Sequence, residues 1–371
     1  MPEPRIKTVE KLRQYLDIAM QIEHATIPPY LLALYSIHPG KNLDATQIIR
    51  VVVVEEMLHL TLAANLLNAV GGRPNLTVPG FVPCYPTGLP NGEEDFVVSL
   101  EPFSQDAVNT FLKIERPKKA ATEPARLHTI IPKARALMRH HGLPVSTLMA
   151  PLEGPDVRYY SIGEFYEEVR RGLDFLYHEL GDDLFSGDPN KQATAEYYYS
   201  GGAKLFPVTD IHSADEAIRT IIDQGEGLGG AIFNEENELA HLYRFDQLVR
   251  GKYYLKGDEP GNPTGPELTV DWNAVYPIKT NVKLTNYPDG SELYEAAVAF
   301  NESYAVFLSL LTTAYNGMPE LLLQAVPQMF RLRDAMYQLI HHPMPGEESS
   351  NAGPTFEMAT KVPVLSVAVT A

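Results

Sequence analysis

The stretch of residues 51–72, VVVVEEMLHLTLAANLLNAVGG, places carboxylates and an imidazole inside a long apolar run. The run continues for about five helical turns without a breaker until two glycines end it, which predicts a helix. Steps of four and three residues from Val52 place Glu56 and His59 on the apolar stripe of that helix. A buried ionised carboxylate costs several kcal/mol unless it is paired or coordinated, so both side chains need partners.

Further amphipathic patterns predict a mainly α-helical protein. A first helix over residues 8–26 carries Glu23 on its apolar face, and Pro28 and Pro29 are expected to end or kink it. Ser161 and Glu164 have the spacing of a capping box at the start of a third helix. The other helices are expected over residues 161–180, 213–225, 232–251, 291–315 and 319–340.

The segments between these helices divide the chain. Residues 74–102 are punctuated by Pro and Gly and predict a loop with a small hairpin, and residues 115–155 predict an exposed excursion. We therefore expect a bundle domain over residues 1–255 with a long loop insertion at about residues 74–158. Residues 256–371 are expected to form a C-terminal helical region packed on that bundle.

A second Glu-x-x-His pair, Glu238 and His241, repeats the spacing of the first on the predicted helix over residues 232–251. Residues three apart project from one helix face, so each pair can converge on one point. Two such pairs and two single glutamates on four helices form the ligand pattern of carboxylate-bridged dimetal sites. Glu23 supplies one single glutamate, and the third helix offers Glu164, Glu167 or Glu168, between which the helical pattern does not decide.

Glu55, His24 and residues 225–230 could also belong to a functional site, but each has a structural explanation. Glu55 is an acceptor for His59 or part of a salt bridge, and His24 points about 100° away from Glu23, which favours packing or a supporting contact. GEGLGG, residues 225–230, lacks the lysine and the preceding strand of a phosphate-binding loop. We expect it to end a helix and form a turn.

Composition limits the partners and the location. The net charge of −17 makes nucleic acid and anionic membranes poor partners. Cys84 is the single cysteine, which excludes a disulfide framework and a thiolate metal cluster and is consistent with a reducing cytoplasm. The first residues show neither a signal sequence nor an apolar span, so we expect a cytoplasmic protein that could form a homo-oligomer.

Several of these stretches, in their order, resemble a known family. IEHATIPPYLLALYSI, VVVEEMLHLTLAANLLNAVGGRP, SIGEFYEEV, ELAHLYRFDQL and AGPTFEM are similar to the ferritin-like family that includes the iminophenyl-pyruvate dimer synthase domain of violacein-type pigment biosynthesis. The resemblance implies a ferritin-like four-helix bundle whose members in pigment pathways couple two imines of aromatic 2-oxo acids oxidatively. It also implies a metal site, carried over here onto Glu23, Glu56, His59, Glu164, Glu238 and His241.

The leading expectation is a di-iron oxidoreductase of secondary metabolism that uses O2. Its substrate would be a small organic molecule, aromatic or derived from an amino acid. Two iron ions are the expected cofactor, although the same oxygen and nitrogen ligands suit manganese. The alternatives are an iron storage or detoxification protein and a metal-free structural or interaction module.

Overall fold

The computed structural model describes residues 4–92, 95–117, 158–198 and 204–359, and helices dominate them. Two short strands form a hairpin after the last helix. The elements are α1 (Val9–Ser36), α2 (Leu43–Ala69), α3 (Gln105–Ile114), α5 (Ile162–Leu180), α6 (Ile211–Gly225), α7 (His241–Arg250), α8 (Glu292–Ala314), α9 (Leu322–Ile340), β1 (Pro343–Met344) and β2 (Glu347–Asn351).

Helices α1 and α2 form the centre of the molecule and pack against each other along their length. Their short connection makes them antiparallel neighbours, as in helical bundles. The Thr8 side chain caps α1 by accepting from Lys11 N at 3.1 Å. The expectation that prolines end this helix is wrong, since α1 continues through buried Pro28 and Pro29 to Ser36. Packing against neighbouring helices outweighs the local cost of proline here.

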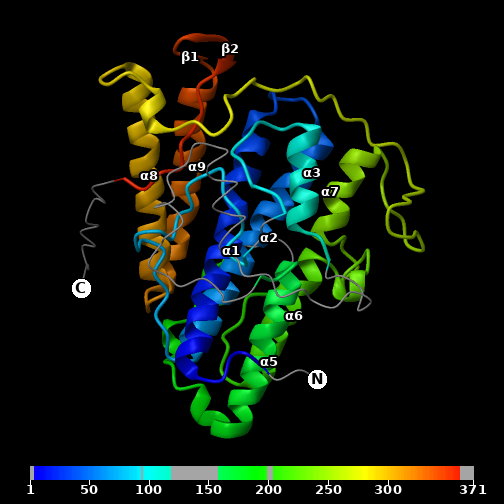
Figure 1. The fold of residues 1–371 in the computed structure, drawn as a ribbon, viewed down its shortest axis with the longest axis vertical. Helices are drawn as coiled ribbons and strands as arrows, with labels where there is room; N and C mark the ends of the chain where they lie inside the picture. The colour runs from blue at the N-terminus through cyan, green and yellow to red at the C-terminus, as the bar shows by residue number, and fades with distance from the viewer. Residues whose placement is uncertain (1–3, 93–94, 118–157, 199–203, 360–371) are drawn as a thin grey trace.

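Two shorter helix pairs complete the bundle on one side of α1 and α2. Helix α5 packs on α1 and on α6, and α6 also packs on α2, whereas α3 packs on α7 and α7 packs on α2. Figure 1 shows α3 and α7 in the upper half of the molecule and α5 and α6 in the lower half. The layer of helices that packs on α1 and α2 is therefore broken between these two pairs, where α6 ends and α7 begins.

Helices α8 and α9 cover the other side of α1. They pack against each other, α9 contacts α1, and their apolar side chains join the same hydrophobic core as those of the bundle. Strands β1 and β2 pair in antiparallel register, with Pro343 opposite Asn351 and Met344 opposite Glu347.

The structure confirms most of the predicted helices, extends the first one and shortens the one predicted over residues 232–251. The expected hairpin in residues 74–102 is reduced to one antiparallel bridge between Thr87 and Val98. Helix 232–251 begins only at His241, because Phe233 and Leu239 form a bridge around a turn in which Asn237 has φ of 65°. Most of the predicted excursion over residues 115–155 lies outside the described residues. None of the described helices is long and apolar enough to cross a membrane.

Candidate metal centre

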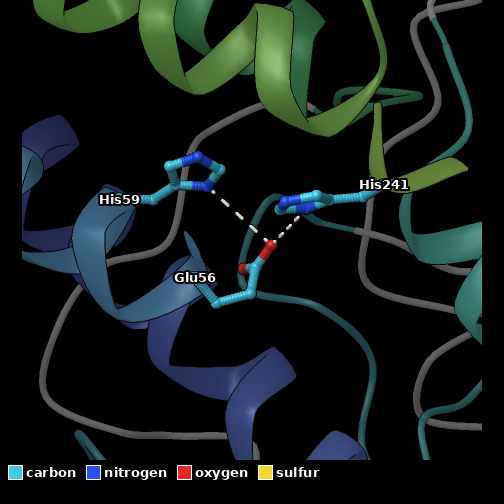
Figure 2. Close-up of side chains that lie close together, drawn as sticks. All are labelled: Glu56, His59 and His241. Carbon is cyan, nitrogen blue, oxygen red and sulfur yellow. Dashed lines mark ion pairs between the residues drawn. The ribbon is translucent and has the colours of Figure 1, made fainter. Parts of the chain in front are cut away.

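The candidate centre lies where α2 passes the start of α7. Glu56 and His59 project from α2, and His241 is the first residue of α7. His241 Nδ1 lies 2.9 Å from Glu56 Oε1, and His59 Nδ1 lies 3.8 Å from the same oxygen. Figure 2 shows the Glu56 carboxylate between the two rings, whose planes are 25° apart with centroids at 5.3 Å. Ligand atoms from the three residues lie within 4.8 Å of one another, so this group could hold a metal ion.

Three further carboxylates surround this group. Glu23 Oε2 of α1 is 3.6 Å from His59 Nδ1, and Glu115 Oε2 at the end of α3 is 3.6 Å from His241 Nδ1. A cavity of about 20 Å³ is lined by Glu23, Glu56, His59 and Glu115 together with Glu226, which directly follows α6. All six side chains are buried. The centre therefore gathers four carboxylates and two imidazoles, which is the ligand composition of dimetal sites in helical bundles.

Each histidine is oriented by an oxygen atom that lies within hydrogen-bond distance of its Nε2. His241 Nε2 lies 2.8 Å from Glu55 Oε2, and His59 Nε2 lies 2.9 Å from Gln224 Oε1. If each Nε2–H donates to these oxygens, the Nδ1 lone pairs face the carboxylates, as metal-ligating imidazoles require. His241 Nδ1 is buried near Glu56 and Glu115, but none of the described residues meets it with the geometry of a hydrogen bond. A cation in the centre would satisfy this nitrogen, so the residues fit a metal site.

Hydroxyl groups fix one oxygen of three of the carboxylates. Tyr166 donates to Glu23 Oε1 at 2.7 Å, and Thr26 donates to Glu56 Oε2 at 2.8 Å. Tyr30 donates to Glu115 Oε1 at 2.5 Å. In each case the other oxygen is the one that approaches an imidazole. The carboxylates are therefore held with one oxygen directed at the centre.

The electrostatics of the centre favour a cation. Burial, together with the nearby Glu115 carboxylate, raises the pKa of Glu56 to about 7. Burial alone would lower the pKa of His241, but its contacts with Glu115, Glu55 and Glu56 raise that pKa well above the usual value. Burial would raise the pKa of Glu55, but the hydrogen bond with His241 outweighs it and the pKa is lowered. Without a metal, the centre therefore retains protons to balance its negative charge.

The structure brings together four of the six residues to which the sequence assigned metal ligation: Glu23, Glu56, His59 and His241. Glu238 precedes α7, is 43% exposed and contacts Arg244 at 3.4 Å, so it does not share a helix face with His241. Ser161 caps α5 by accepting from Glu164 N at 3.0 Å, and Glu164 Oε2 accepts from Tyr160 N at 2.9 Å rather than facing the centre. The placement of Glu164 and Glu238 thus differs from the expectation.

The other third-helix candidates also face elsewhere. Glu168 is buried but accepts from Arg5 N at 2.6 Å and pairs with Arg171 at 2.7 Å. Glu167 lies 4.0 Å from Arg170 on the half-exposed side of α5. Glu115 and Glu226, and not Glu164 or Glu238, line the cavity beside Glu23, Glu56 and His59.

The sequence around Glu115 and Glu226 indicates only in part that these residues lie at the centre. Glu115 directly follows the apolar residues of α3, a short helix capped by Ser104 whose apolar face is buried. Glu226 stands in GEGLGG, which does end a helix and turn as expected. Both glutamates lie at helix ends, and helical periodicity does not indicate where a side chain at a helix end points.

A buried set of carboxylates and imidazoles within a helical bundle is typical of the metal-binding helical proteins. A family model described as Ferritin-like matches residues 16–250 of this chain. The chain therefore belongs to the ferritin-like family, and the predicted fold class is confirmed.

Two individual proteins are similar to this chain. Dichlorochromopyrrolate synthase of Lentzea aerocolonigenes is 26% identical over 336 residues, which cover 83% of this chain and 29% of that protein. The chain thus spans under a third of the length of this relative. A ferritin-like protein from Caulobacter vibrioides has a solved structure that matches with a TM-score of 0.60 at 24% identity, covering 95% of this chain and 100% of the other. This second likeness supports the fold alone.

Proposed function

We propose that the protein is a dimetal oxidoreductase that uses O2 on a small organic molecule, with iron as the expected metal. Glu23, Glu56, His59, Glu115, Glu226 and His241 would hold the metal pair. The observation that carries the proposal is the pair of imidazoles whose Nε2 atoms are bonded outward, to Glu55 and Gln224, beside four buried carboxylates. A structural role would not require so many acids in one buried place.

The surrounding residues would hold the ligand side chains in place while the charge of the bound metal ions changes. Tyr30, Tyr166 and Thr26 each hold one carboxylate oxygen, and Glu55 with Arg244 at 3.5 Å supports His241. These contacts preserve the ligand positions, and burial excludes water from them. Bound redox-active metal ions would supply the electron transfer to O2 that none of these side chains provides.

The substrate class is proposed from the relative. The name dichlorochromopyrrolate synthase describes a protein that makes an aromatic compound, and its similarity covers 83% of this chain. We infer an aromatic metabolite derived from an amino acid, such as the imine of an aromatic 2-oxo acid. Oxidative coupling forms a C–C bond between the enamine tautomers of two such imines and breaks one C–H bond on each. O2 takes up the two electrons and two protons released and becomes hydrogen peroxide.

The proposal is tested by O2 uptake after anaerobic loading with Fe(II). An amino-acid oxidase with catalase would generate imines from phenylalanine, tyrosine or tryptophan, and mass spectrometry would detect coupled products. Iron-loaded wild-type protein should increase O2 uptake beyond the oxidase background and yield a coupled product, and the Glu56→Ala and His241→Ala variants should not. If O2 uptake and product were the same without iron and in both variants, the proposal would be overturned. Retention of far more than two iron ions per chain would instead favour iron storage.

A further inference from the structure

A second cavity lies on the opposite side of the α1–α2 pair from the metal centre. It has a volume of about 570 Å³ between α1, α2, α8 and α9, and its lining includes Ile27, Val54, Met57, Phe307 and Leu308. Along α2 these wall residues alternate with Glu56 and His59, which face the other way. The volume falls within the range of small-molecule sites, about 300–1,000 Å³.

The wall of this cavity carries a buried histidine with spare hydrogen-bonding capacity. His24 Nε2 lies 2.5 Å from the hydroxyl of Tyr304, and both residues line the cavity. His24 is 2% exposed, and its Nδ1 has no hydrogen-bond partner in the part of the chain that the structure describes. An unsatisfied buried polar atom is costly, so a polar ligand atom bonded there would be stabilising.

The lining also includes two arginines. Arg50 comes from α2 and Arg333 from α9. Tyr35 lines the same cavity. Burial raises the pKa of Tyr35, and the charges of Arg333 and Arg50 oppose that rise. Arg333 also contacts Asp334 at 3.0 Å and lies over the ring of Phe330. Asp334 lies outside the lining, which includes these two arginines and, among the described residues, no carboxylate. The cavity itself therefore favours an anion, although the chain as a whole is acidic.

We infer that this cavity binds an amphipathic organic anion, with an apolar, aromatic-sized body inside and an acidic group directed at Arg50 and Arg333. A polar atom on the body of the ligand would complete the hydrogen bonding of His24. The inference goes beyond the proposed function, because the cavity shares no lining residue with the metal centre. Its test therefore uses metal-free protein and is independent of activity.

The test compares two fluorescent probes that share aromatic rings and differ in charge. Anilinonaphthalene sulfonate is an anion and N-phenyl-naphthylamine is neutral, and fluorescence titration would give the Kd and stoichiometry of each. We expect one sulfonate probe per chain. Arg50→Gln and Arg333→Gln should each raise its Kd about tenfold, as expected for loss of a charged hydrogen bond. The neutral probe should bind both variants as it binds the wild type.

Arg331→Gln is the matched control, because Arg331 lies on the same helix but does not line the cavity. Ala325→Phe adds volume to the wall and should weaken both probes, with the melting temperature checking that this variant folds. Equal sulfonate affinity in all arginine variants, or several weakly bound probes per chain, would overturn the inference. Tighter binding of both probes after removal of residues 360–371 would also overturn it, because it would identify the chain's own C-terminal residues as the occupant.

Discussion

At the residue scale, the centre depends on groups that orient its ligands. Glu55 accepts from His241 and lies 3.5 Å from Arg244, whereas Glu238 contacts the same arginine from outside the centre. The two acids therefore share a neighbour but differ in their access to the imidazole. This difference provides a matched pair of substitutions.

Glu55→Gln should reduce metal affinity at least tenfold, because it weakens the acceptor that keeps His241 Nδ1 directed at the centre. Isothermal titration with a divalent metal would measure the change. Glu238→Gln is the control and should bind as the wild type does. Equal losses in the two variants would show that Arg244, and not His241, transmits the effect.

The stabilisation gained on metal binding should grow as the pH rises. The pKa of Glu56 is raised from its ordinary value of 4.5 to about 7 in the folded metal-free protein. The stability that protonated Glu56 contributes is therefore present below pH 4.5 and is lost as the pH rises to about 7. The raised pKa of His241 acts in the same direction, since the stability it contributes is lost as pH rises through that pKa. Metal requires the deprotonated forms and reverses both effects.

Melting temperatures with and without metal, at about pH 6 and about pH 8, would check this. The increase in melting temperature caused by metal should be larger at the higher pH. Equal increases would mean that the bound ion displaces no protons from the centre.

At the element scale, the ends of α3 and α6 bring Glu115 and Glu226 to the centre, which the sequence pattern did not indicate. Periodicity was sufficient for Glu23, Glu56 and His59, because they lie within long helices with one buried stripe. It failed for Glu238, since Asn234 and Asn237 form a turn before α7. Asn residues in a turn were a visible signal, but the approach of Glu115 and Glu226 depends on tertiary packing.

Gly163 allows α5 to approach the end of α6 at the centre. A Cβ added there would lie 2.1 Å from Glu226 Oε1. Gly163→Ala should therefore displace this carboxylate and lower metal affinity, at little cost in stability because the atoms that must move are the end of a flexible side chain.

Gly172→Ala is the control for this prediction, because its Cβ would meet Ile6 at 2.5 Å, on the same helix but outside the centre. Gly172→Ala should lower the free energy of unfolding, measured in urea, by about 1–3 kcal/mol, and only Gly163→Ala should lower metal affinity. Similar metal affinities in the two variants would argue against a role for Glu226 as a ligand.

At the scale of the whole molecule, the C-terminal helices are part of the core. Tyr304 bonds to His24, Tyr315 lies 2.9 Å from Thr61, and the carbonyl of Tyr315 accepts from Asn68 Nδ2 at 2.7 Å. These contacts join α8 and the residue after it to both central helices. The division of the chain at residue 255 remains a prediction, and these contacts suggest that the two parts are not independent.

A protein ending at residue 255 should lose cooperative unfolding, because removal of α8 and α9 exposes the apolar side of α1 and α2. Thermal unfolding followed by circular dichroism would measure this. A protein ending at residue 359 retains every described contact and is the control, which should keep a cooperative transition. A sharp transition in the shorter protein would show that the bundle folds alone.

The most direct test of the metal centre is metal content per chain, measured by plasma mass spectrometry after anaerobic iron loading and removal of unbound metal. We expect about two ions in the wild type and in the Glu164→Gln and Glu238→Gln variants. Glu115→Gln and Glu226→Gln should each lose metal clearly. Full metal content in Glu115→Gln and Glu226→Gln with loss in Glu164→Gln and Glu238→Gln, or no bound metal in the wild type, would show that the proposed centre is wrong.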